Sequence, residues 1–349
     1  LRGINVFFTP HFTSAIAAFG IVFTTYACIV ASEIWFVYRK FFVEEAKRLK
    51  GATGLDGIRG LIYNILTLGA YDISKEALET DHKVAVYLAA IGVPVAAFLH
   101  GYAGFIFGSV KANALWMTPL MPVIFILSAV VSGIALCMLT YIVILEFSLI
   151  KASFGKGRSE NIKQQVRAAQ METIRLTKKY LLIFLVAAIS LELLDLIFRG
   201  YTAVKSWDIL RSVIYERDFN LIFVMQYGFG NLLPFILLML PRISVRRTVV
   251  ALVLVLFGVF MMRWNVVIGG QSFSLTFSGF MHYSLPIIPH NIETVKEGLI
   301  GALAVIATPY IILVGLNFII PVIPHFEEDH SLPPAHPDPP QHPTTWTPS

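Results

Sequence analysis

The chain has 349 residues, of which 56% are hydrophobic and only 14% are charged. A soluble domain carries about a quarter charged residues, so this composition excludes an ordinary water-soluble enzyme. The net charge of +5 is spread over short segments between long apolar runs. Without a basic surface domain, nucleic-acid binding is a poor explanation of that charge, and the pattern predicts an all-α polytopic membrane protein.

Seven apolar runs are long enough to cross a bilayer as helices, which need about 20 residues each. A shorter run, Leu61–Ala70, is too short to cross and is predicted to lie at the membrane surface. The predicted spans, in chain order, are Phe12–Tyr38, Val84–Phe107, Thr118–Ile150, Tyr180–Val204, Phe219–Leu240, Thr248–Ile268 and Leu299–Ile323.

The two ends of the chain differ from the apolar middle. No basic stretch, short apolar core and cleavage site precede the first span, so a signal peptide is not expected, and we expect the first residues of a longer protein to be missing. We predict one membrane domain over residues 1–324 and a Pro-rich cytoplasmic tail over 325–349. The tail is expected to be disordered. We favour a solvated tail, with weak metal binding by its three later histidines as the alternative.

Lys and Arg residues predict the orientation, because they concentrate on the cytoplasmic side of membrane proteins. Nineteen of the 27 follow the first, third, fifth and seventh spans. These segments are therefore assigned to the cytoplasm, the start of the chain to the outside and the C-terminus to the inside. We expect a multi-pass protein of the cytoplasmic membrane.

Redox cofactors held by this chain alone are not expected. Cys28 and Cys137 belong to no CxxC or CxxCH motif, which argues against a bound iron–sulfur cluster or attached c-type haem. His100 is the only histidine well inside a span, so a haem with two axial histidines is improbable. No protein metal site and no ATP-binding loop are predicted. Electrons would have to pass through an organic carrier or through partner subunits.

Polar groups gather in the outer half of the predicted spans, where they are costly unless they serve a purpose. Glu192, Asp195 and Arg199 follow one another at helical spacing and share one face. Further polar residues of the predicted spans, most of them in the outer half, are His100, Tyr102, Gln226, Asn231, Arg263 and Asn265.

Two more acids, Glu33 and Glu146, are predicted near the cytoplasmic side, with Glu192 at mid-depth. Together the three form an interrupted series of carboxylic acids across the membrane, which could carry protons. Contact of Glu33 and Glu146 with interfacial water or with basic side chains is the alternative that we favour for this pair. For Glu192, a proton-carrying role and a structural hydrogen bond are equally supported.

The segment FLHGYAGFIFG, residues 98–108, admits two interpretations. Its glycines, Gly101, Gly104 and Gly108, could allow close helix approach, since Gly104 and Gly108 form a small-xxx-small pair. Alternatively, they leave room for a flat quinone ring whose carbonyl oxygens accept hydrogen bonds from His100 and Tyr102.

FLHGYAGFIFGSVKANALW, the following PLMPVIFILSAVVSGIAL, and RWNVVIGGQ at residues 263–271 resemble the NrfD/PsrC family. The opening FFTPHFTSAIAAFGIVFTTY is a weaker match. That family comprises quinone-interacting membrane subunits of polysulfide reductase, nitrite reductase and related complexes. Within it, HGYAGFIFGSVKAN and RWNVVIGGQ are most similar to the DsrP branch, from the DsrMKJOP complex of sulfur-metabolising microbes.

This resemblance implies an eight-to-ten-helix double four-helix bundle, of which seven helices would lie in this chain. It implies an outer quinone pocket in which Tyr102 corresponds to the family's tyrosine, near a docked ferredoxin-like iron–sulfur subunit. The family's partner His and Asn come from its first helix, which we expect to precede this chain, and His100 is not carried over in the same way.

The sequence therefore predicts a haem-free membrane subunit, not catalytic alone, that exchanges electrons between menaquinone or a related quinone and a DsrO-like iron–sulfur subunit. Other membrane and cytochrome subunits are expected partners. Tyr102, His100, Asp195, Arg199 and Arg263 are assigned to the quinone site. Glu192, Glu146 and Glu33 are assigned to a proton path. A secondary transporter or proton channel, and a purely structural anchor for redox subunits, are the alternatives.

Overall fold

The computed structural model of this chain describes residues 14–113, 115–153, 159–201, 207–242, 244–273 and 298–317, and single positions between 273 and 298 and at residue 11. The predicted tail 325–349 and the end of the last predicted span lie outside these residues. Within them, every regular element is helical. The elements are α2 (Ala15–Arg48), α3 (Leu55–Leu66), α4 (Lys75–Gly108), α5 (Met121–Ser153), α6 (Ser159–Tyr201), α7 (Trp207–Arg211), η1 (Ser212–Arg217), η2 (Asn220–Leu232), α8 (Leu233–Met239), α9 (Val245–Trp264), η3 (Asn265–Gly269) and α11 (Leu299–Asn317).

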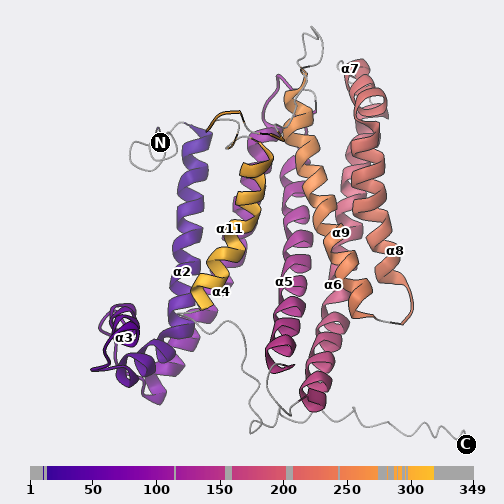
Figure 1. Cartoon of the computed structure of the whole chain (residues 1–349). Coiled ribbons are helices and arrows are strands. Elements are labelled where there is room, and N and C mark those ends of the chain that lie inside the picture. Colours follow the sequence, from indigo (N-terminus) through magenta and orange to yellow (C-terminus); the bar gives the residue numbers. More distant parts are fainter. Residues whose placement is uncertain are drawn as a thin grey trace, which may run out of the picture.

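Seven helical segments are long and apolar enough to cross a membrane. They run up and down along a common direction, as the fold class predicted from the sequence requires (Figure 1). Several helices extend well beyond their predicted spans at the Arg39 end, where charged helical turns carry no hydropathy signal. With 43 residues, α6 is about 65 Å long and exceeds the roughly 30 Å apolar thickness of a bilayer.

The bundle has two ends, which we name by a residue at each. The Tyr102 end carries the loop between α4 and α5 and the short helix α7, and the Arg39 end carries α3 (Figure 1). By the distribution of Lys and Arg described above, the Tyr102 end corresponds to the predicted outer side.

Two groups of helices pack differently. In the first, α2 packs against α4 and α3. In the second, α5 packs against α6 and α9, and α9 also packs against η2 and α8. The second group encloses a core of fully buried aliphatic side chains, among them Val131, Ile142, Ile174, Leu181 and Leu252.

Glycines set the crossing of α4 and α5, which joins the two groups. A Cβ atom on Gly104 would lie 2.7 Å from the Met121 carbonyl oxygen, and one on Gly108 would lie 2.7 Å from the Thr118 carbonyl oxygen. Any larger side chain would separate the helices at this point. The glycines of FLHGYAGFIFG therefore serve close helix approach, which is the first of the two interpretations raised by the sequence.

Tyr102 lies on another face of α4, toward α2. Its ring stacks on Phe19 of α2 at a centroid distance of 6.3 Å. Phe98 and Phe105, one turn away on either side along α4, contact it at 5.8 and 5.7 Å. One short segment thus presents glycines to α5 and an aromatic cluster to α2.

A buried ion pair fixes the Arg39 end of the first group. Arg39 on α2 lies 2.6 Å from the Asp81 carboxylate on α4, and its guanidinium also donates to the carbonyl oxygens of Ala70 and Asp72. Because Arg39 is 4% exposed, these bonds must replace the water it loses. They tie the loop after α3 to the helix pair.

Candidate functional site

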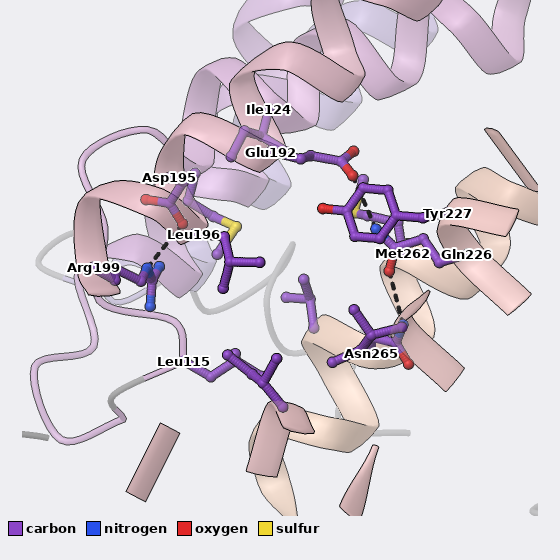
Figure 2. Close-up of a pocket in the computed structure, with 14 residues that line it drawn as sticks. Leu115, Ile124, Glu192, Asp195, Leu196, Arg199, Gln226, Tyr227, Met262 and Asn265 are labelled. Carbon is purple, nitrogen blue, oxygen red and sulfur yellow. Dashed lines mark hydrogen bonds and ion pairs between the residues drawn. The ribbon is translucent and has the colours of Figure 1, made fainter. Parts of the chain in front are cut away.

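A cavity of about 120 Å³ lies at the Tyr102 end of the second helix group. We call it the polar cavity for the six polar side chains among its otherwise apolar walls. Three elements contribute its polar walls: α6 supplies Glu192, Asp195 and Arg199, η2 supplies Gln226 and Tyr227, and η3 supplies Asn265. Leu115 and Leu196 are among its apolar walls (Figure 2). The helical face predicted for the three charged residues of α6 is therefore the face that lines a cavity.

The deeper part of the cavity holds a chain of hydrogen bonds between three helices. The Gln226 amide nitrogen donates to the Glu192 carboxylate at 2.9 Å. The Asn265 amide nitrogen donates to the Gln226 carbonyl oxygen at 2.8 Å. Tyr227 lies beside Glu192 on the same wall (Figure 2). This hydrogen-bonded series therefore has one ionisable group, the Glu192 carboxylate, at one end, followed by the neutral amides of Gln226 and Asn265.

The backbone of η2 helps to place these side chains. Residues 220–232 form π-helical turns, which widen the helix and often occur at functional sites. Gly230 of η2 and Gly258 of α9 meet so closely that a Cβ on Gly258 would lie 2.5 Å from the Gly230 carbonyl oxygen. This contact brings Gln226 and Asn265 within hydrogen-bonding distance.

A second polar cluster forms another part of the cavity wall. Arg199 donates to Asp195 at 2.9 Å, and the Thr118 hydroxyl donates to the other Asp195 oxygen at 2.6 Å. Thr118 belongs to the loop that follows α4, so one hydrogen bond links that loop to α6. Arg199 is 7% exposed, and the pair is effectively internal.

The same loop is bonded to the end of η3. The Asn113 amide donates to the Gly270 carbonyl oxygen at 2.6 Å, and the Trp116 indole N–H donates to the Val266 carbonyl oxygen at 2.5 Å. These residues lie within the segments SVKANALW and RWNVVIGGQ that were singled out in the sequence. In the structure, the two motifs meet as a cap over the cavity.

Asp218 is a titratable group just outside the membrane-spanning segments at this end. Burial raises the pKa of its carboxyl above the ordinary value, and the nearby Arg217 guanidinium opposes part of that rise. Arg217 also donates a hydrogen bond to the Ser272 hydroxyl at 2.5 Å.

The residues assigned to a quinone site from the sequence do not form one cluster in the described chain. Asp195 and Arg199 line the polar cavity, whereas Tyr102 faces α2. Arg263 is held by α5, where it donates to the Ser128 hydroxyl at 2.8 Å and lies 3.8 Å above the Phe125 ring. His100 is exposed on the surface of α4.

The three acids of the proposed proton path also lie in separate parts of the structure. Glu192 is in the cavity, while Glu146 accepts a hydrogen bond from Gln170 at 3.1 Å near the Arg39 end. Glu33 lies on α2, which belongs to the other helix group. Buried aliphatic side chains, including Ala135, lie in the core of α5 and α6 between Glu146 and Glu192.

Several members of the cavity were not assigned a role from the sequence. For Gln226 and Asn265, the sequence offered one indication of a functional role, namely a polar side chain within an apolar span. Tyr227 and Thr118 had no comparable signal. Tyr227 stands among aromatic and apolar neighbours, and Thr118 sits in a loop whose packing depends on residues far along the chain.

The fold and this cavity define a multi-pass helical membrane protein with a preformed polar site at one end. The family model described as "Polysulphide reductase, NrfD" matches residues 2–275. The chain therefore belongs to the NrfD family, and the resemblance to the NrfD/PsrC family drawn from its motifs is confirmed.

Two curated relatives are similar to part of the chain. The chain is 38% identical over 122 residues to a selenate reductase subunit of Mesobacillus selenatarsenatis, and the match covers 33% of this chain and 27% of that protein. It is 24% identical over 213 residues to a protein of Halobacterium salinarum described as a putative dimethyl sulfoxide reductase membrane subunit, and the match covers 60% of this chain and 43% of that protein. The matches span less than half the length of either relative.

Proposed function

We propose that this chain is the membrane subunit of a respiratory redox complex and binds menaquinone or a related quinone near Tyr102. Electrons would pass between that quinone and an extracytoplasmic, ferredoxin-like iron–sulfur subunit. Membership of the NrfD family supports a role as a membrane redox subunit. So do two relatives named as subunits of selenate and dimethyl sulfoxide reductases.

The quinone proposal rests on the environment of the Tyr102 side chain. Its ring is packed among Phe19, Phe98 and Phe105, and its hydroxyl has no hydrogen-bond partner within the described residues. An unmade hydrogen bond in an apolar span costs free energy. A flat, uncharged ring with carbonyl oxygens fits this setting, since it can stack on the aromatic side chains and accept the bond.

Each assigned residue then has a role that its own chemistry supports. Tyr102 would bind and orient the ring by donating its hydroxyl proton to a carbonyl oxygen, and His100 would assist from the surface of α4. A bound quinone would supply two-electron, two-proton redox chemistry at this end of the bundle. Arg263 and the Asp195–Arg199 pair would shape the electrostatic field beside the site.

Glu192 is the acid we propose for proton exchange, because the hydrogen bond from Gln226 holds it at a polar cavity. Glu146 and Glu33 remain proposed members of a longer path. A proton moving from Glu192 to Glu146 would have to pass the buried aliphatic core between them. We therefore propose that rapid exchange at Glu192 takes place with the Tyr102 end.

The finer assignment follows the sequence motifs. The similarity of HGYAGFIFGSVKAN and RWNVVIGGQ to the DsrP branch supports a place in sulfur or sulfite metabolism, with a DsrO-like iron–sulfur partner and further membrane and cytochrome subunits. We place the protein in the cytoplasmic membrane, with the Tyr102 end outside and the C-terminus in the cytoplasm, on the distribution of Lys and Arg.

Purification of the native complex in mild detergent tests this proposal. Subunit composition and bound quinone would be measured on the same sample. We expect iron–sulfur subunits and near-stoichiometric quinone. A chain that purifies without redox partners and without quinone would contradict the proposal and favour transport, whereas a complete complex lacking quinone would favour a structural anchor.

A further inference from the structure

A second hollow lies on the lipid-facing side of the second helix group, between α6 and η2. It is a groove of about 450 Å³, which is within the usual size of small-molecule sites. Its walls are mostly apolar and include Val186, Leu193, Phe223 and Phe235. Val186 is 46% exposed and Leu193 38% exposed, so the groove opens toward the position of the lipid.

Three polar side chains interrupt this apolar lining: Ser190, Tyr227 and Asn231. Asn231 is only 8% exposed, yet its amide forms no hydrogen bond within the described part of the chain. Ser190 likewise has no side-chain partner among the described residues. Among the described residues no fully enclosed side-chain N or O atom lacks a hydrogen-bond partner, so the Asn231 amide is open to the groove. In an apolar medium such a donor without a partner costs several kcal/mol by transfer estimates, roughly 2–7. The arrangement calls for a ligand with hydrogen-bonding oxygen atoms.

The depth of Ser190 and Asn231 in the membrane limits the chemical class of ligand that the groove can bind. Ser190 lies 11 residues before the end of α6 at Tyr201, which corresponds to roughly 16 Å along a helix. Asn231 lies past the middle of the span Asn220–Met239. A charged phospholipid headgroup is too costly at this depth. A quinone ring is uncharged and carries carbonyl oxygens, and its isoprenoid tail can run along the apolar walls.

We propose that this groove is a second quinone-binding site, separate from the region of Tyr102. The Asn231 amide and the Ser190 hydroxyl donate hydrogen bonds to the carbonyl oxygens, and the tail leaves past Val186 toward the lipid. Tyr227 lines both this groove and the polar cavity. A ring in the groove is therefore separated from Glu192 by one side chain. The inference rests on the proposed function only for the class of ligand.

Photolabelling of the purified complex tests the site. The probe is an azido-naphthoquinone with a two-isoprene tail, and labelled peptides are mapped by mass spectrometry. In the wild type we expect label in residues 186–193 or 223–235. Asn231→Leu keeps the branching at Cγ but removes the donors, and should lower groove labelling by about tenfold, the effect of losing one hydrogen bond to a buried acceptor.

Two further variants keep the test decisive if Asn231→Leu is poorly folded. Leu193→Trp fills the groove from its lipid-facing wall and should abolish groove labelling without disturbing the core. Met225→Leu, on a part of η2 that lines neither hollow, is the matched control and should label like the wild type.

The outcomes separate this inference from the Tyr102 proposal. Tyr102→Phe should weaken label near residues 98–105 and leave groove labelling unchanged. Label near residues 98–105 with none in the groove would overturn the second site alone. Groove labelling that survives both Asn231→Leu and Leu193→Trp would also overturn it, as would recovery of phospholipid and no quinone from the groove.

Discussion

The polar cavity of the second helix group and the surroundings of Tyr102 in the first satisfy their polar groups in opposite ways. In the second group, Glu192, Gln226 and Asn265 bond to one another around a cavity. In the first, the buried charges pair at the Arg39 end, while the Tyr102 hydroxyl at the other end has no partner in the described chain. The comparison indicates where ligands bind. Polar side chains that bond to one another form a site that is complete without a ligand. A hydroxyl without a partner indicates a surface that binds a further molecule.

The largest effect is expected where the first group buries a charge pair. Arg39→Met leaves Asp81 buried without its cation, and breaking such pairs costs about 3–5 kcal/mol. Thermal unfolding of the purified protein would measure the loss. Lys40→Met is the matched control, since Lys40 is 56% exposed, and it should unfold like the wild type. Equal stability of the two variants would show that the pair does not hold this group together.

The junction of the two groups is the next target. Gly104→Leu forces a side chain into the Met121 backbone and should cost about 1–3 kcal/mol through overpacking and helix separation. Gly133→Leu on α5 is the control, because a Cβ there meets nothing within 4 Å. Detergent stability assays should separate the two variants. A Gly133→Leu protein as unstable as Gly104→Leu would argue against the α4–α5 crossing.

The polar chain of the second group should behave as a unit. Gln226→Leu removes one hydrogen bond from Glu192 and one from Asn265, and each bond lost by a buried polar group costs about 1–3 kcal/mol. In a double-mutant cycle with Asn265→Leu, we expect a coupling of roughly 0.5–3 kcal/mol. Additive effects of the two substitutions on stability would show that the amides do not interact.

The smallest expected effect is a pH dependence at the rim of the second group. Burial raises the pKa of Asp218 in the folded protein, so the folded state holds its proton to higher pH than the unfolded state. The stability linked to this group is therefore complete below the unfolded pKa and is lost as pH rises through the folded pKa. Asp218→Asn should flatten the stability profile above about pH 4, the ordinary range of an Asp carboxyl, measured by unfolding at a series of pH values. A profile identical to the wild type would contradict the assignment.

Much of the fold follows from the sequence, since seven apolar runs of sufficient length are enough to predict seven spans. The helix ends do not follow as well. For α6 the predicted span begins at Tyr180, whereas the helix begins at Ser159, because a polar helix that leaves the bilayer has no hydropathy signal. The interfacial prediction at Leu61–Ala70 overlaps α3, which begins earlier, at Leu55.

The candidate site was predictable only in part. Spacing alone placed Glu192, Asp195 and Arg199 on one face, because three- and four-residue steps bring side chains together on any helix. Which helices face that side is decided by packing between distant segments. The π-helical turns of η2 and the contact of Gly230 with Gly258 bring Gln226 to Glu192 and Asn265, and no local pattern in the sequence shows this.

The most direct test of the central claim is the quinone-dependent turnover of the intact complex with Tyr102→Phe. Tyr87→Phe on the same helix is the matched control, since Tyr87 is 70% exposed. We predict about a tenfold or greater loss of turnover for Tyr102→Phe, the effect of one hydrogen bond, with assembly intact and with Tyr87→Phe unchanged. Full turnover in an assembled Tyr102→Phe complex would contradict the account.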